Sequence, residues 1–141
     1  MKFLPLLREL ASSYQAFERF SAPHIKSMNL TASQFDVIAT LANQPPMTCK
    51  ELGEQTLITK GTLTGILDRL VIKEMIERSS NDEDGRSQKI RLTEYGQSIF
   101  SQAFPSHMQH LQKAFDQLSE ADMHNLSASL KKLRLAMEKH T

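Results

Sequence analysis

The feature that most constrains this chain is a short amphipathic stretch, residues 59–70, that lies upstream of a polar turn and an alternating strand. Leucine and isoleucine recur in it at i, i+3, i+4 and i+7, the spacing of one buried helix face. Small polar residues and glycine occupy its other face. The pattern predicts a helix that packs through one side and leaves a small, polar surface on the other.

Two further helices are predicted before this one. Thr31 with Gln34, and Thr48 with Glu51, have the spacing of capping boxes, in which side chain and backbone satisfy each other at a helix start. Two consecutive prolines end the first of these helices, because proline cannot continue the hydrogen-bond ladder. The second helix is short and turns near Thr59 into the amphipathic helix, so the pair is predicted to form a helix-turn-helix.

A β-hairpin is predicted after the helix-turn-helix. Residues 76–79 and 88–92 are its expected strands, because apolar and basic side chains alternate in the second one. Asp84 and Gly85 lie between them, where aspartate and glycine favour turn conformations. A helix-turn-helix followed by such a hairpin is a winged helix-turn-helix.

Long amphipathic helices are predicted on both sides of this lobe. Residues 3–27 form the first, which Pro23 is expected to kink or interrupt. Thr93 caps the next, with a kink or break expected at Pro105, and Ser119 starts the last. The winged lobe is too small to cover these helices, so their apolar stripes are predicted to form a dimer interface. The residues assigned to that interface are Leu7, Leu10, Leu126, Leu130, Leu133 and Met137.

The predicted fold class is therefore mainly α with a small β-hairpin wing, within a single domain spanning residues 1–141. A winged helix-turn-helix lobe at about 30–95 lies between dimerisation helices at about 1–28 and 97–141. The apolar content of 40% suits one buried core. The net charge is +1, and residues 45–92 hold eight basic and eight acidic side chains. Binding to a polyanion must then come from local arrangement, and its salt dependence from a few residues.

Several classes of protein are disfavoured by the sequence. No apolar run approaches the roughly 20 residues of a membrane span, and the start lacks the apolar segment of a signal peptide. Cys49, the single cysteine, cannot form an internal disulfide, which agrees with a reducing compartment. We therefore expect a cytoplasmic protein without a membrane partner. Because catalytic motifs and a phosphate-binding glycine loop are missing from the sequence, we expect neither an enzyme nor a cofactor.

Four stretches carry residues at a recognisable spacing. They comprise Leu30, Thr31, Gln34, Phe35, Val37 and Ile38; Leu52, Gly53, Lys60, Gly61, Thr62, Leu63, Thr64, Leu67, Asp68, Arg69 and Leu70; Ile76, Glu77 and Arg78; and Asp84, Gly85, Arg86, Ser87, Ile90, Leu92, Thr93 and Gly96. In these residues the chain resembles the MarR family of bacterial transcriptional regulators. The resemblance implies a homodimer, joined by its first and last helices, with two winged lobes on a palindromic double-stranded DNA operator. It further implies repression, more rarely activation, and release by a small lipophilic or phenolic effector.

Two positions depart from the family pattern. Glu74 stands where the family commonly has a glycine after the second helix of the helix-turn-helix, so the helix is expected to end without a glycine cap. Gly65 stands where some relatives place an arginine that reaches a base edge. The helix is therefore predicted to read DNA shape and methyl groups more than guanines.

The polar face of this helix is predicted to contact DNA. In a helix-turn-helix, the N-terminal part of the second helix enters the major groove. Thr62 and Thr64 are assigned to base readout, because a threonine can hydrogen-bond a base edge and its methyl can touch that of thymine. Thr59 and Lys60 are assigned to phosphate, which the partial positive charge of a helix N-terminus also attracts. Gly61 lets a phosphate or base approach the backbone closely.

The wing is predicted to place Arg86 in the neighbouring minor groove, where narrow A·T tracts concentrate negative potential. Asp84 is the expected orienting partner of that arginine; alternatively the two merely pair on the surface. Ser87 and Lys89 are assigned to the DNA backbone, and Thr48 is also assigned to DNA binding. The runner-up hypothesis is a winged-helix adaptor that binds protein.

Two other features suggest alternatives. Cys49, beside Lys50 at a helix start, has surroundings that favour a thiolate and hence a redox-responsive regulator; the alternative is a small inert residue. His107 and His110 lie on one helix face and could form half a metal site, with the remaining ligands supplied by His24 or His124. A solvated or ligand-lining histidine pair is preferred, and no metal is expected.

Overall fold

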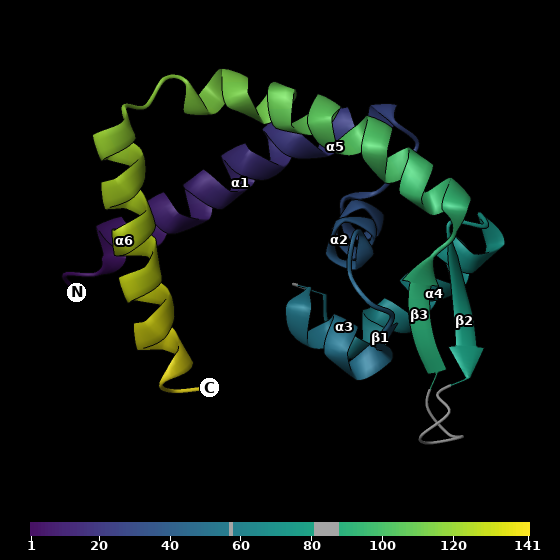
Figure 1. Cartoon of the computed structure of the whole chain (residues 1–141). Helices are drawn as coiled ribbons and strands as arrows, with labels where there is room; N and C mark the ends of the chain where they lie inside the picture. The colour runs from purple at the N-terminus through teal and green to yellow at the C-terminus, as the bar shows by residue number, and fades with distance from the viewer. Residues whose placement is uncertain (57, 81–87) are drawn as a thin grey trace. The chain divides into compact units, whose positions relative to one another are not determined.

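Helices dominate the chain, as the sequence predicts, and a small sheet lies beside the helix-turn-helix (Figure 1). The computed structural model describes residues 1–56, 58–80 and 88–141. Within them the elements are α1 (Leu4–Ser27), α2 (Ala32–Leu41), β1 (Met47–Thr48), α3 (Cys49–Gln55), α4 (Lys60–Ile72), β2 (Ile76–Ser80), β3 (Gln88–Leu92), α5 (Glu94–Phe115) and α6 (Glu120–Glu138). The chain forms two compact units, Met1–Met108 and Gln109–Thr141. The predicted fold class is confirmed.

Helix α2 lies at the centre of the first unit, where it contacts α1, α3, α4 and β3 (Figure 1). Apolar residues at helical spacing on α2 and α4 meet there. The fully buried side chains include Val37, Ile38, Leu52, Leu63, Leu67, Leu70, Ile76 and Ile90. Each such side chain contributes about 1.5–3 kcal/mol through its removal from water, so this cluster fixes the orientation of α4.

The helix starts in this unit follow their sequence signals. Thr31 Oγ1 accepts a hydrogen bond from the Gln34 N–H, and Gln34 Oε1 accepts one from the Thr31 N–H, each at 3.1 Å. Thr48 Oγ1 likewise accepts from the Glu51 N–H at 3.1 Å. Asn29, just after α1, has a left-handed backbone conformation with φ 63°.

The sheet contains one strand more than the sequence predicted. Strands β2 and β3 pair antiparallel as the expected hairpin, with Ile76 opposite Leu92. Strand β1 pairs antiparallel with the other edge of β3, which gives the order β1-β3-β2. Because β1 has only two residues, no alternation could reveal it before the fold brought it beside β3.

Neither long helix is interrupted at its proline. Helix α1 continues through Pro23 to Ser27, and α5 continues through Pro105 to Phe115. The break considered at Pro105 is therefore wrong. A proline removes one hydrogen bond to the residue four positions earlier, and the remaining bonds of these 24- and 22-residue helices hold each one together.

The end of α4 is joined to the start of α5. Glu74 has φ 62°, so the helix does end in a left-handed residue that is not glycine. The Met75 N–H then bonds to the Leu70 carbonyl at 3.0 Å. Thr93 donates its hydroxyl to the Glu74 carbonyl at 2.6 Å and its N–H to the Met75 carbonyl at 3.0 Å. The Thr93 Oγ1 also caps α5 by accepting from the Gly96 N–H at 3.0 Å.

The second unit contains the end of α5 and the whole of α6. Ser119 and Asp122 form the predicted capping box at the start of α6. Helix α6 has no buried residue, although its sequence carries a leucine stripe. Across the part of the chain that the structure describes, no helix is both long and apolar enough to cross a membrane.

Candidate nucleic-acid interface

The N-terminal turn of α4 presents a small polar surface. Thr59 is the residue before the helix, and its carbonyl accepts from the N–H groups of Thr62 and Leu63, each at 3.0 Å. The hydroxyls of Thr59 and Thr62 lie 3.0 Å apart, and both residues are exposed, as is Thr64. The side chain of Lys60 lies outside the described part of the structure. The three threonines predicted to contact DNA thus lie on the exposed side of one helix end.

The two glycines of α4 are not required by packing. A Cβ added at Gly61 or at Gly65 would meet no other heavy atom within 4 Å. Glycine inside a helix costs about 0.5–1 kcal/mol relative to alanine, because it loses more backbone freedom on folding. The glycines therefore reduce helix stability. They also leave the backbone of α4 without side chains on its outer surface, so another molecule can approach it closely.

Thr48 and Lys89, predicted separately as DNA contacts, are brought together by the sheet. They are Cα partners across β1 and β3, and both side chains are half-buried. The start of α3, directly after Thr48, is thereby fixed to the wing. Sequence reasoning could assign both residues to DNA, but it could not place them side by side without knowing that β1 exists.

The tip of the wing, with Asp84, Arg86 and Ser87, lies outside the described residues, so the roles of these three remain predictions. Arg91 Nε donates to Glu77 Oε1 at 2.6 Å across the hairpin. The positive charge of Arg91 on β3 is therefore compensated by Glu77 on β2.

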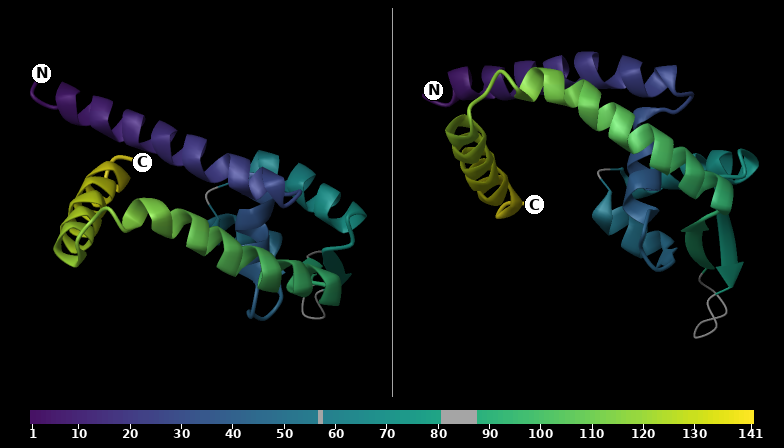
Figure 2. Two further views of the ribbon diagram at one scale, coloured as in Figure 1. Left: turned by 90° about the horizontal axis from the view of Figure 1, so that it is seen from above. Right: turned by 45° about the horizontal axis from the view of Figure 1, so that its top comes forward.

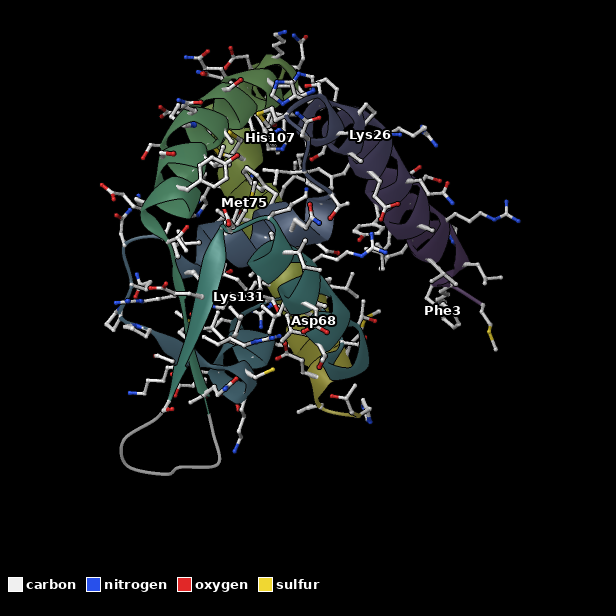
Figure 3. All side chains as sticks on the ribbon, turned by 90° about the vertical axis from the view of Figure 1, so that its right-hand side faces the viewer. Phe3, Lys26, Asp68, Met75, His107 and Lys131 are labelled. Atoms are coloured by element: carbon white, nitrogen blue, oxygen red, sulfur yellow. The ribbon has the colours of Figure 1, made fainter. Side chains whose placement is uncertain are left out.

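A groove of about 710 Å³ separates the polar face of α4 from the wing. Lys50, Thr64 and Ser80 line it, together with Thr48. An ion pair crosses from one wall to the other: Arg78 Nη2 donates to Asp68 Oδ1 at 2.7 Å. Figure 3 labels Asp68 on α4. The sequence assignment missed Lys50, Arg78 and Ser80, although 78 and 80 share one face of β2 by simple alternation.

Cys49 lies in the same groove but also packs against the core. Its side chain is half-buried and contacts the apolar cluster beneath α3. This placement gives Cys49 a packing contact with the core. A redox role for the thiol stays a prediction.

His107 is buried, with 2% of its surface exposed, so the solvated alternative is wrong for this histidine, whereas the ligand-lining alternative stays a prediction. Its Nε2 lies 3.1 Å from Ser21 Oγ, and its Nδ1 lies 2.9 Å from His24 Nδ1. The two imidazole rings stack, and Phe35 packs edge-on against His107 at a centroid distance of 5.1 Å. These contacts hold α1 beside α5 (Figure 2). The sequence could not reveal the burial, because His107 and its partner Ser21 are 86 residues apart. Among the described residues, no group of three or more metal-ligand side chains gathers.

The residues assigned to dimerisation leave apolar surface open to solvent. Leu10 and Leu133 are half-buried, whereas the others are exposed. The exposed fractions are 48% for Leu7, 48% for Leu126, 56% for Leu130 and 50% for Met137. Phe3, Leu4, Leu6 and Phe17 add to the exposed surface of α1. Large exposed apolar side chains on an amphipathic helix are typical of an interaction site.

Known proteins share this arrangement of helices and wing. The sequence model of the MarR family matches residues 30–88. An uncharacterised HTH-type transcriptional regulator of Bacillus cereus (strain ATCC 10987) is 30% identical over 138 residues, which are 97% of this chain and 89% of the relative. A crystal structure of a MarR mutant from E. coli complexed with operator DNA has a TM-score of 0.85 and 28% identity, covering 94% of this chain and 95% of that one.

A second solved relative is regulated by a small molecule. Bordetella bronchiseptica BpsR, whose DNA binding is regulated by 6-hydroxynicotinic acid, has a TM-score of 0.82 and 25% identity. The match covers 92% of this chain and 98% of that one. The helix-turn-helix, the wing and the matched relatives agree, and the proteins of this family are transcription regulators and not enzymes. The chain belongs to the MarR family and is a DNA-binding transcriptional regulator.

Proposed function

We propose that this protein is a cytoplasmic repressor that binds a palindromic operator as a homodimer and leaves it when a small effector binds. The observation that carries the DNA contact is the exposed face of α4, where three threonines and two glycines gather without any packing reason for the glycines. A helix of this kind can lie close to the floor of the major groove, since Gly61 and Gly65 present no side chain.

Base and phosphate contacts divide along α4 and the wing. Thr62 and Thr64 are exposed and would contact base edges and thymine methyls. Thr59, Lys60 and the N–H groups of the first turn would hold phosphate. The neighbouring pair of Thr48 and Lys89 supports a further backbone contact. In this division only a few side chains read base edges. The shape and deformability of the operator DNA would therefore add to the sequence selectivity.

The wing would contribute its charge mainly through Arg86. With Arg91 paired to Glu77, the described strands of the wing offer Lys89 as a cation that is not engaged in an ion pair. We therefore propose that Arg86 enters the minor groove and that Ser87 touches the backbone. Few released counterions would follow, and the salt dependence of binding would be shallow.

A second copy of the chain is the proposed cover for the exposed apolar residues of α1 and α6. A twofold dimer presents the same surface from both subunits, which suits a palindromic site. The two copies of α4 would then lie about 34 Å apart, one turn of DNA, in the bound state.

Release by a small molecule is supported by the regulation of the Bordetella relative by 6-hydroxynicotinic acid. For this chain we propose a small lipophilic or phenolic effector. Displacement of a labelled operator during a screen of such compounds would identify it.

The DNA contact is tested by selecting bound sequences from a random duplex pool and then measuring affinity for the selected operator. Arg86→Ala should weaken specific binding by about 1–3 kcal/mol. Arg91→Ala is the matched control on the same hairpin. It should lose less DNA affinity than Arg86→Ala, because Glu77 already pairs with the Arg91 guanidinium. An unchanged affinity in Arg86→Ala would remove the wing from the mechanism. Failure of the selection to enrich any sequence would overturn operator recognition itself.

A further inference from the structure

A second groove lies at the opposite end of α4 from the proposed DNA contact. It has a volume of about 670 Å³ and is formed where α1 ends, α2 begins and α4 ends. Three cations line it, Lys26, Arg69 and Lys73, and no acidic residue does. The groove takes no part in the DNA contacts proposed above.

The charges of these three side chains are not compensated. Throughout residues 1–56, 58–80 and 88–141, no carboxylate lies within ion-pair distance of Lys26, Arg69 or Lys73. Lys73 Nζ donates only to neutral oxygens, the Asn29 carbonyl at 3.0 Å and Gln34 Oε1 at 3.2 Å. Three arginines elsewhere in the described residues do pair with acids: Arg78 with Asp68, Arg91 with Glu77 and Arg134 with Glu138. The groove therefore concentrates positive charge in a chain whose net charge is only +1.

Two further properties of the walls suit an amphipathic anion. The start of α2 contributes N–H groups with partial positive charge, and Thr31 at that start lines the groove. Leu30, with 3% of its surface exposed, and Ile72, with 80% exposed, add apolar surface beside the cations. Such an exposed isoleucine gains from any ligand that covers it.

We propose that this groove binds a small organic anion that carries two negative charges and a short apolar body, such as a phosphate monoester. The planar guanidinium of Arg69 matches the oxygens of phosphate or carboxylate in a bidentate manner, and lysines hold phosphate as point charges. Three uncompensated cations favour a dianion over the single charge of a simple carboxylic acid. The volume also falls within the roughly 300–1,000 Å³ of ligand sites.

DNA is a poorer occupant than a small anion. Helix α4 has 13 residues and is about 20 Å long, which separates its last turn from its first. A duplex read by the first turn would lie away from the groove at the other end. Figure 3 labels Lys26 on α1, which is not part of the helix-turn-helix or the wing.

A bound dianion would connect two elements with different roles. Lys26 belongs to α1, whereas Arg69 and Lys73 lie at the end of α4. The ligand would tie the proposed dimerisation helix to the proposed recognition helix and so alter DNA affinity. This second step rests on the proposed function, whereas binding of the anion does not.

Binding is tested without DNA by titrating the full-length protein with phenyl phosphate and following backbone amide shifts by NMR. We expect saturable shifts at Thr31 to Gln34 and at Ile72 and Lys73. Benzoate carries one negative charge where phenyl phosphate carries two. Its affinity for the groove should therefore be about two- to fivefold lower for each ion contact that it cannot make. Lys26→Gln and Arg69→Gln should each weaken phenyl phosphate about two- to fivefold. Lys139→Gln, an exposed lysine outside the groove, should change nothing.

Three results would overturn the proposal. The first is no saturable shift at millimolar phenyl phosphate, and the second is shifts confined to residues outside the groove. The third is a loss of operator affinity in Lys26→Gln and Arg69→Gln with phenyl phosphate binding unchanged, which would assign these cations to DNA. Because the titration contains no DNA, a failure of operator recognition would leave its result standing.

Discussion

Gly96 passes so close to Met75 that a Cβ on Gly96 would overlap the Met75 carbonyl group. The same carbonyl oxygen accepts a hydrogen bond from the Thr93 N–H at 3.0 Å. The first turn of α5 is therefore packed directly on the backbone that links α4 to the wing. Glycine at position 96 is required by this contact, and Gly96 is buried accordingly.

Gly96→Ala should destabilise the fold by about 1–3 kcal/mol, because the added methyl forces two backbone segments apart. Urea unfolding followed by circular dichroism measures the loss. Gly53→Ala is the matched control: its Cβ would lie 3.7 Å from Leu63 Cδ2, which is ordinary contact. Equal stability of the two variants would contradict a close approach at Gly96.

Glu74→Gly should stabilise the protein by about 1–2 kcal/mol, since glycine adopts the left-handed conformation without the strain that an L side chain suffers. Glu74→Ala removes the same carboxylate but retains the backbone strain, so this variant should not be more stable than the native protein. The comparison of denaturation midpoints separates backbone strain from charge. If alanine and glycine stabilise equally, the left-handed residue is not strained.

Gly65→Ala should have opposite effects on stability and on DNA binding. The helix should gain about 0.5–1 kcal/mol, because alanine is the better helix former and has open space around it. Operator affinity should fall, since the methyl stands on the surface proposed to face the major groove. Thermal unfolding and an operator titration on the same preparation measure both. Unchanged DNA affinity would show that the major groove does not approach Gly65.

Glu77→Gln should strengthen DNA binding and steepen its salt dependence. Removal of the carboxylate frees Arg91, and one added phosphate contact raises the slope of log K against log salt by about 0.9. Glu138→Gln is the matched control, because it frees Arg134 from a similar pair on α6. A salt titration by fluorescence anisotropy compares them. Equal slopes in the two variants would place Arg91 away from DNA.

Leu130→Asp should dissociate the proposed dimer, because it would bury an unpaired charge in the interface. Light scattering at micromolar concentration gives the mass of the species. Leu135→Asp is the control, since Leu135 is similarly exposed, at 49%, but lies outside the predicted stripe. A dimer that persists in Leu130→Asp would move the interface elsewhere, and a monomeric native protein would refute it entirely.

Local signals in the sequence predicted most of the fold, because they act within one or two turns of chain. The capping pair of Thr31 and Gln34 and the apolar spacing of Leu63, Leu67 and Leu70 depend only on near neighbours. The missed features depend on distant ones. Strand β1 exists only beside β3, and the burial of His107 requires α1 to reach α5.

The candidate site divides in the same way. The threonines at the start of α4 are exposed as the pattern indicated, because helix periodicity decides which residues face outward, and their contacts with DNA stay a prediction. The pairing of Arg91 with Glu77 depends on hairpin register, which the strands alone did not specify. The groove proposed to bind an anion was not predicted from the sequence. Its cations come from the ends of α1 and α4, and Lys26 is more than 40 positions from Arg69 in the chain.

Thr93 binds two consecutive carbonyl groups, those of Glu74 and Met75, and so fixes the start of α5 to the turn that ends α4. These bonds couple the first turn of α5 to the end of α4, so a tilt of that turn would shift the end of α4 with it. In a dimer, the separation of the two reading helices would be set by the angle at which each α5 leaves the interface. An effector could abolish operator binding by changing that angle alone, with every contact inside the lobe preserved.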